Sequence, residues 1–245
     1  DRRQVIAFGV EEQAAEQRFR GFARRRFAGA HHAIDVRQRL FALLGLVGDA
    51  RQDHAVARIF EAKGRPRFNP LIIHVADLAS AGRYARLTPE AERLARAFWP
   101  GPLTLVLPLL PDAGLSPLVT AGNDSVAVRV PAHPVAQALL RRFGGPLAAP
   151  SANPSGRVSP TRAAHVLDGL DGRIEAVIDG GEAAVGVEST IVGLLGAPLL
   201  LRPGGLALED LDQVQALDSP YLAQLGKNTF LIVRHLKHPN ELVAK

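Results

Sequence analysis

Short apolar segments that alternate with segments of helical periodicity constrain the fold of this chain most. Between residues 53 and 205, helices are expected over 53–63, 87–99, 133–144 and 159–172, and strands over 70–76, 103–109, 125–131, 146–149, 174–181, 189–195 and 198–205. Helices and strands are therefore mixed, and the last strands follow one another without a helix between them. This order favours a twisted mixed β-sheet flanked by helices, an α/β (α+β) fold, over a purely doubly wound one.

Particular residues mark the expected ends of these helices. Asp53, Thr88 and Ser159 are expected N-caps, because their side-chain oxygens can accept hydrogen bonds from the free N–H groups of a first turn. Gly144 is expected to end the helix over 133–144, since glycine readily adopts the left-handed conformation found after a last turn.

Composition excludes several classes of protein. With no cysteine among its 245 residues, the chain has no disulfide, thiolate metal site or thiol nucleophile. No apolar run reaches the roughly 18–20 residues of a membrane span, and the N-terminus lacks the pattern of a secretory signal. We therefore expect a cytoplasmic protein without a membrane partner.

Positive charge is concentrated in the first third of the chain. The net charge is +5, and residues 1–75 hold 14 Lys/Arg against 8 Asp/Glu, whereas residues 76–245 hold 15 against 16. This excess suits attraction of nucleotide or RNA phosphates, and equally suits a solvated arginine-rich surface.

Residues 1–44 are atypical, because they are arginine-rich and include a helix-compatible arm over 11–29 whose apolar residues keep no clean period. Residues 207–245 are expected to form an appended tail, with one strand-like run over 229–236.

Two loops combine cations or hydroxyls with the end of a strand or helix. In "KGRPRFNPLIIH", Lys63, Arg65 and Arg67 alternate through a Gly-Pro turn, which is either a phosphate clamp or a surface turn. His74 follows inside an apolar strand, where a histidine is more often structural than catalytic. In "APSANPSGRVSPT", the hydroxyl side chains stand at a strand-to-helix junction that favours an anion or simple capping.

Two strands carry further candidates. Ser125, Ala127 and Arg129 of "SVAVRVP" share one face because strand side chains alternate. Arg129, flanked by valines, needs an anion, which is either a protein carboxylate or a ligand. Arg202 ends the last strand, and Ser189 begins an earlier one.

No standard phosphate loop, dinucleotide motif, nucleophile elbow or zinc-protease motif occurs. Cations, hydroxyls and one amide suit the binding of a nucleotide and a small anion by fixed donors, without a protein nucleophile or a metal cage.

Six segments together resemble one family. The segments "KGRP…NPLIIHV", "WPGPLTLVL", "VAVRVP", "APSANPSGRVSPT", "GVEST" and "LRPGG", in this order, closely resemble the YrdC-like threonylcarbamoyl-AMP synthases over residues 45–206. The resemblance implies a YrdC/RibB-like fold enclosing a basic cavity. It also implies a nucleotidyltransferase that joins L-threonine, bicarbonate or CO2, and ATP, with Mg2+, into threonylcarbamoyl-AMP for tRNA modification. The implied macromolecular partner is tRNA or the threonylcarbamoyl transferase that uses the product.

The resemblance also implies roles for individual residues. Lys63 and Arg65 would be catalytic. The ATP contacts would be Lys63, Arg65, Asn69, Ser125, Ser151, Asn153, Ser159 and Arg202. The threonine contacts would be His74, Arg129, Ala149 and Ser189, and no residue is assigned to a metal.

One segment departs from the family. The family carries "PTETVYGLG" before the KGRP turn, where this chain has "RLFALLGLV" over residues 39–47. Leu40 then replaces a threonine-binding Thr, and Leu44 replaces the Tyr. One wall of the pocket is expected to be altered, and the activity to be impaired.

Two other functions remain open. One is a non-catalytic RNA- or nucleotide-binding module, which a steep salt dependence of RNA affinity would reveal. The other is a related carbamoyl-adenylate-forming domain, as in hydrogenase maturation proteins, although those usually lie in longer chains with zinc-finger cysteines.

Overall fold

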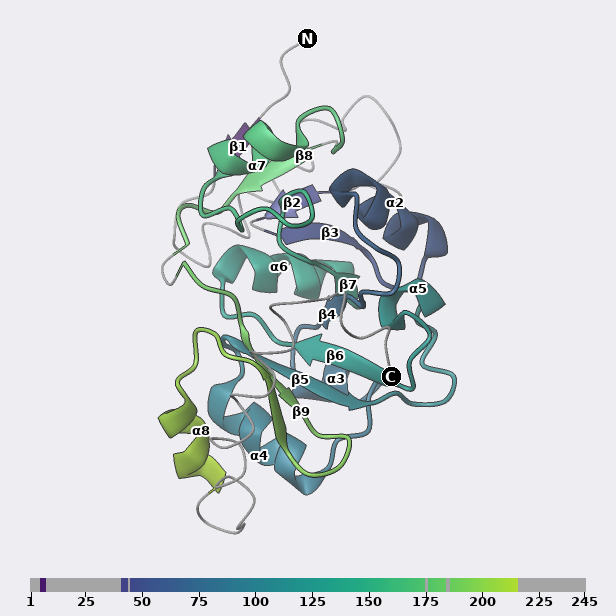
Figure 1. Cartoon of the computed structure of the whole chain (residues 1–245), viewed down its shortest axis with the longest axis vertical. Coiled ribbons are helices and arrows are strands. Elements are labelled where there is room, and N and C mark those ends of the chain that lie inside the picture. The colour runs from purple at the N-terminus through teal and green to yellow at the C-terminus, as the bar shows by residue number, and fades with distance from the viewer. Residues whose placement is uncertain (1–4, 8–40, 44, 175, 184–185, 216–245) are drawn as a thin grey trace, which may run out of the picture.

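A mixed β-sheet with helices on both faces forms the centre of the computed structural model, which describes residues 5–7, 41–43, 45–174, 176–183 and 186–215 (Figure 1). The strands within these residues are β1 (Val5–Ala7), β2 (Phe41–Leu43), β3 (Gly45–Asp49), β4 (Ile72–His74), β5 (Leu103–Pro108), β6 (Ser125–Arg129), β7 (Leu147–Ala148), β8 (Ala176–Asp179), β9 (Thr190–Gly193) and β10 (Leu199–Arg202). Their order across the sheet is β1-β8-β2-β3-β7-β4-β6-β5-β9-β10.

Both strand orientations occur in the sheet. β4 pairs with β6 in parallel, and β5 pairs with β9 in parallel. The pairs β5–β6, β4–β7, β3–β7 and β9–β10 are antiparallel. The predicted twisted mixed sheet with flanking helices is therefore confirmed.

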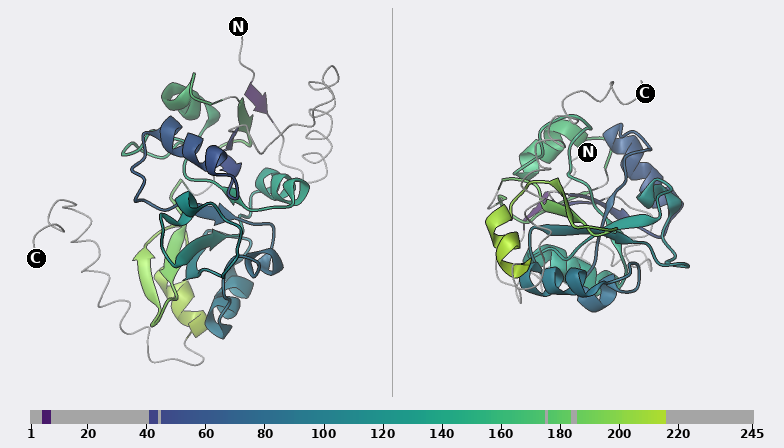
Figure 2. Two further views of the ribbon diagram at one scale, coloured as in Figure 1. Left: turned by 90° about the vertical axis from the view of Figure 1, so that its right-hand side faces the viewer. Right: turned by 60° about the horizontal axis from the view of Figure 1, so that its bottom comes forward.

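Helices cover the sheet from two sides. They are α2 (Asp53–Lys63), α3 (Leu78–Ala81), α4 (Pro89–Phe98), α5 (Pro117–Thr120), α6 (Pro134–Phe143), α7 (Ala163–Leu170) and α8 (Leu208–Gln215). The view along the sheet shows α2 and α7 on one side and α4 on the other (Figure 2). Within the described part of the chain, no helix is long and apolar enough to cross a membrane.

Helical spacing explains how the helices contribute to the core. On α2, Val56, Ile59 and Phe60 follow a three-then-one spacing that places them on one face, and all three are buried. They pack in the same cluster as Ile73 of β4 and Leu105 of β5. The apolar stripe that the sequence predicts for this helix therefore faces the sheet.

The predicted helix ends are partly right. The Thr88 hydroxyl accepts a hydrogen bond from the Ala91 N–H at 3.2 Å, and Gly144 ends α6 with a φ of 71°. Asp53 is not the N-cap of α2, because the helix already includes it and Gln52 precedes it. The helix therefore begins one residue earlier than the sequence pattern predicted.

The expected cap of the helix over 159–172 is wrong. α7 begins at Ala163, with Arg162 at the N-cap position, and the Ser159 hydroxyl instead donates to the Glu188 carboxylate at 2.5 Å. The Ser159 hydroxyl thus bonds to a carboxylate 29 residues away in the sequence and does not cap the helix.

The expected terminal segments are only partly within the described residues. Residues 208–215, expected to begin a tail, form α8, and its Leu211 is buried in the main core cluster with residues of α4. The expected arm over 11–29 and the strand-like run over 229–236 lie outside the described residues.

A close approach of two backbone segments joins the end of β10 to the start of β9. The Gly205 N–H donates to the Glu188 carbonyl at 2.8 Å, which brings Gly204 against residues 188–190. A Cβ on Gly204 would meet backbone atoms of Glu188, Ser189 and Thr190 at 2.4 Å. Only glycine fits here without a shift of the backbone.

Gly204→Ala is expected to lower the free energy of unfolding by about 1–3 kcal/mol, because the added methyl group must displace backbone rather than a flexible side chain. Urea unfolding followed by circular dichroism measures this change. Gly196→Ala is the control, since a Cβ there meets nothing within 4 Å. Equal stability of the two variants would contradict the steric argument.

Candidate active site

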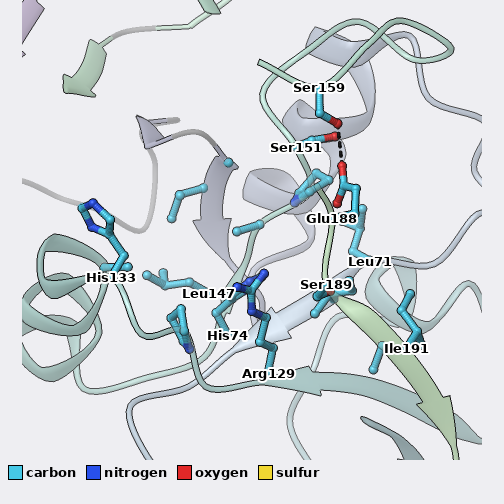
Figure 3. Close-up of a pocket in the computed structure, with 18 of the residues that line it drawn as sticks. Leu71, His74, Arg129, His133, Leu147, Ser151, Ser159, Glu188, Ser189 and Ile191 are labelled. Atoms are coloured by element: carbon cyan, nitrogen blue, oxygen red, sulfur yellow. Dashed lines mark hydrogen bonds between the residues drawn. The ribbon is translucent and has the colours of Figure 1, made fainter. Parts of the chain in front are cut away.

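A cavity of about 540 Å³ lies among the ends of several strands, helix α6 and the loops around residues 65–70, 149–161 and 186–189 (Figure 3). Nine of the twelve predicted site residues line it, and these are Arg65, Asn69, His74, Arg129, Ala149, Ser151, Ser159, Ser189 and Arg202. Lys63, Ser125 and Asn153 are not among its lining residues. Residues that are far apart in the sequence thus converge on one cavity.

Sheet register explains why His74 and Arg129 are neighbours. The two residues are paired across the parallel strands β4 and β6, and His74 is also paired with Leu147 of β7. Residues paired across strands point to the same face of a sheet, here the face that lines the cavity. Burial, followed by the nearby Arg129 charge, lowers the pKa of His74 to about 3. The imidazole is therefore neutral at neutral pH.

Arg129 has donors left for a ligand. Its Nε donates to the Gly101 carbonyl at 3.0 Å, which fixes the direction of the side chain. Its other guanidinium N–H groups have no hydrogen-bond partner among the described residues, and the side chain lines the cavity. Burial partly desolvates its charge and so lowers the pKa of Arg129. Such a group favours an anion in the cavity.

Arg202 and Ser189 are joined across β10 and β9. The Arg202 guanidinium donates to the Ser189 carbonyl through Nε at 3.1 Å and Nη2 at 2.9 Å, and Nη2 also reaches the Ser189 hydroxyl at 3.1 Å. The same hydroxyl shares a 2.7 Å hydrogen bond with Thr104 of β5. Ser189 is thus held firmly at the wall of the cavity, with most of its hydrogen-bonding capacity used.

Arg65 organises the turn that it belongs to. Its Nε donates to the Asn69 carbonyl at 3.1 Å, and its Nη2 donates to Asn69 Oδ1 at 2.7 Å and to the Pro70 carbonyl at 2.8 Å. These contacts fix the "GRPRFN" turn at the edge of the cavity. Arg67 in the same turn is exposed and is not among the lining residues.

Lys63 and Asn153 lie behind the cavity and hold its loop. Lys63 is only 3% exposed, and its ammonium donates to the Ser151 carbonyl at 2.6 Å and the Asn153 carbonyl at 2.5 Å. The Asn153 amide donates to the Arg157 carbonyl at 2.6 Å. Burial lowers the pKa of Lys63 to about 8, so the ammonium still carries its charge at neutral pH.

Ser125 lies at the end of β6 opposite to Arg129 and does not line the cavity. Ser125 begins the strand, opposite Pro108 of β5, whereas Arg129 ends it. Ser125, Ala127 and Arg129 are all half-buried between the buried Val126 and Val128, as the alternation predicted. Ala127 and Arg129 line the cavity.

Sequence reasoning did not assign two features of the cavity. Glu188, on the loop before β9, lines it and contacts Ser159, but the motif "GVEST" was used only for Ser189. The other feature is an apolar wall that includes Leu139 and Leu140 of α6. The sequence predicted a helix over 133–144, and nothing in that prediction indicated that part of the helix lines a cavity.

Comparison with known proteins identifies similar chains. The Sua5/YciO/YrdC family model, described as "Telomere recombination", matches residues 42–204. The threonylcarbamoyl-AMP synthase of Bacillus subtilis is 52% identical over 172 residues, which is 69% of this chain and 49% of that protein. The chain spans about half the length of this relative and of the threonylcarbamoyl-AMP synthases of Pyrococcus abyssi and Schizosaccharomyces pombe.

Solved structures agree with the fold. The Sua5 protein of P. abyssi complexed with L-threonine is 44% identical, with a TM-score of 0.72, over 88% of this chain and 61% of that chain. YciO of E. coli has a TM-score of 0.68 at 18% identity, over 86% of this chain and 100% of that chain, and its likeness shows the fold alone.

The stability of the protein is expected to depend on pH through His74. The folded-state pKa of about 3 lies below the ordinary value of 6.5, so between these values the unfolded chain binds the extra proton. The contribution of neutral His74 is therefore present above about pH 6.5 and is lost as the pH falls toward 3.

His74→Gln is expected to lose less unfolding free energy than the wild type between pH 6.5 and pH 4, measured by urea unfolding. His54→Gln, which changes an exposed histidine on α2, is the control and should follow the wild type. The same dependence of unfolding free energy on pH in all three proteins would contradict the role given to His74.

Proposed function

Because the chain belongs to the Sua5/YciO/YrdC family, we propose that its cavity joins L-threonine, bicarbonate or CO2, and ATP into L-threonylcarbamoyl-AMP, with release of pyrophosphate. The observation that carries this proposal is the convergence of Arg65, Arg129 and Arg202 with serine hydroxyls on one cavity. A volume of about 540 Å³ is in the range of small-ligand pockets, which hold about 300–1,000 Å³.

The threonine end of the proposed site is formed by Arg129 and His74. The free N–H groups of Arg129 suit the carboxylate of an amino acid, and neutral His74 beside them adds no second charge. The Sua5 structure that contains L-threonine supports an amino acid as the ligand of a related protein. Ala149 and Ser189 line the same cavity and complete the proposed threonine contacts.

The nucleotide end of the proposed site is formed by the two loops and β10. Arg65, Asn69, Ser151, Ser159 and Arg202 provide guanidinium, amide and hydroxyl donors to ATP. Lys63 and Asn153 are not lining residues, and in this proposal they act by holding the loop that carries Ser151. Ser125, the remaining predicted ATP contact, stays a prediction.

The proposed chemistry requires alignment and charge neutralisation more than a protein nucleophile. The threonine nitrogen attacks the carbon of CO2 and loses a proton, which gives a carbamate. A carbamate oxygen then attacks the α-phosphorus of ATP, and the bond to the bridging oxygen breaks as pyrophosphate leaves. Fixed cations lower the barrier by stabilising charge on the phosphates. Arg65, which lines the cavity, is the proposed catalytic cation, whereas a catalytic role of Lys63, which does not line it, stays a prediction.

A magnesium ion has no acidic cage among the described residues. No group of three or more His, Cys, Asp or Glu side chains able to hold a metal occurs there. Mg2+ commonly binds through one or two carboxylates together with substrate phosphates. An ion that accompanies ATP would therefore rest mainly on its phosphates.

The wider role follows from the product. Threonylcarbamoyl-AMP is an activated acyl donor, and we propose that it supplies a tRNA-modifying threonylcarbamoyl transferase in the cytoplasm. Leu40 and Leu44, which replace the family's threonine-binding Thr and its Tyr, lie outside the described residues. The reduced activity expected from them stays a prediction.

The proposed reaction predicts pyrophosphate release from ATP only when both threonine and bicarbonate are present. A coupled phosphate assay with pyrophosphatase measures this release, with each substrate omitted in turn. Release that is indifferent to threonine would reject the proposal.

Arg129→Met is expected to raise the KM for threonine by about 100-fold, because a carboxylate would lose a partly desolvated cationic partner. The KM for ATP should change much less. Arg157→Met, which removes an exposed arginine that is not among the lining residues, is the control. An equal rise of the KM for threonine and the KM for ATP in Arg129→Met would place the carboxylate of threonine elsewhere. A circular dichroism spectrum checks that the variant is folded.

A further inference from the structure

Glu188 is the only carboxylate among the described residues that line the cavity. One of its oxygens accepts a hydrogen bond from the Ser159 hydroxyl at 2.5 Å, drawn as a dashed line in Figure 3. The other oxygen lies 3.5 Å from the Arg202 guanidinium. Glu188 therefore connects the loop over 149–161 to the end of β10.

The negative charge of Glu188 acts on four nearby cations. Burial lowers the pKa of Lys63, Arg65, Arg129 and Arg202, whereas the charge of Glu188 raises the pKa of each. Arg65 also lowers the pKa of Lys63, and Arg202 lowers the pKa of Arg129, because like charges repel. The carboxylate thus offsets part of the repulsion and desolvation that gathering these cations costs.

We propose that Glu188 is a resident counter-ion, whose carboxylate holds the place of a ligand phosphate in the free cavity. The inference rests on the proposed function for the identity of that phosphate. Ser159 and Arg202, the two groups that contact the carboxylate, are both proposed ATP contacts. A phosphate that takes these donors must replace the carboxylate, since two anions cannot share them without repulsion.

The local structure allows this exchange. The Glu188 side chain is 42% exposed, so it can turn toward water. Its carbonyl is held by the Gly205 N–H, and the next residue, Ser189, is held by Arg202 and Thr104. The side chain can therefore move while the backbone of the loop stays in place.

Two effects of opposite sign follow. The carboxylate stabilises the cation cluster when the cavity is free, and it competes with phosphate when a ligand is present. Such competition weakens the hold on pyrophosphate and so favours its release after the reaction. A residue that contacted the ligand directly would have the opposite effect on affinity.

Glu188→Gln separates these roles, because the amide keeps an oxygen for Ser159 and removes the charge. Binding of inorganic pyrophosphate to the full chain, without threonine, is measured by calorimetry at low ionic strength. The variant is expected to bind pyrophosphate about threefold to tenfold more tightly than the wild type and to melt at a lower temperature. Added salt should shrink the difference in affinity, because the carboxylate is partly exposed.

Two control variants sharpen the result. Glu182→Gln removes the same charge from an exposed carboxylate, paired with Arg162, that is not among the lining residues, and its affinity for pyrophosphate should match the wild type. Glu188→Asp keeps the charge and should not gain affinity.

Unchanged or weaker pyrophosphate binding by Glu188→Gln would overturn the inference, as would an equal gain in Glu182→Gln or the absence of binding in every protein. The proposed reaction is judged separately, by the threonine-dependent release of pyrophosphate. Tighter binding by Glu188→Gln in a chain that shows no such release would support the counter-ion and reject the reaction.

Discussion

The link between the Lys63 ammonium and the loop over 149–161 is the interaction on which the cavity most depends. Lys63 ends α2, and its ammonium is buried against the carbonyls of Ser151 and Asn153. The Ser155 N–H donates in return to the Lys63 carbonyl at 2.8 Å. Burying an ammonium is costly, and charge-assisted hydrogen bonds to carbonyl oxygens offset part of that cost. These hydrogen bonds tie the end of α2 to the segment that carries Ser151 and Ser159 to the cavity.

Patterns within one element predicted most of the fold and one face of the site. The alternation in "SVAVRVP" placed Ala127 and Arg129 on the face that lines the cavity, and the spacing in α2 placed its apolar stripe in the core. Both follow from the geometry of a single strand or helix. The mixed sheet followed from the order of such segments along the chain.

Contacts between distant residues could not be predicted in the same way. Ser159 has the residue type and position of an N-cap, but its hydroxyl bonds to Glu188, 29 residues away. Lys63 and Asn153 are 90 residues apart in the sequence, and only the fold shows that the lysine supports a loop behind the cavity. In each case a tertiary contact satisfies a polar group that a local rule had assigned to its own segment.

The same cations that suit the cavity to an anion make the free protein less stable. Arg129 illustrates this, because it is partly desolvated, repelled by Arg202, and left with N–H groups that have no partner among the described residues. A core built for stability alone would replace such groups with apolar side chains. Part of their cost is offset by the Glu188 carboxylate, whose charge raises the pKa of Arg129 and of Arg202. An anion that completes the hydrogen bonds of Arg129 would remove part of that cost, so ligand binding and folding stability are coupled through the same guanidinium.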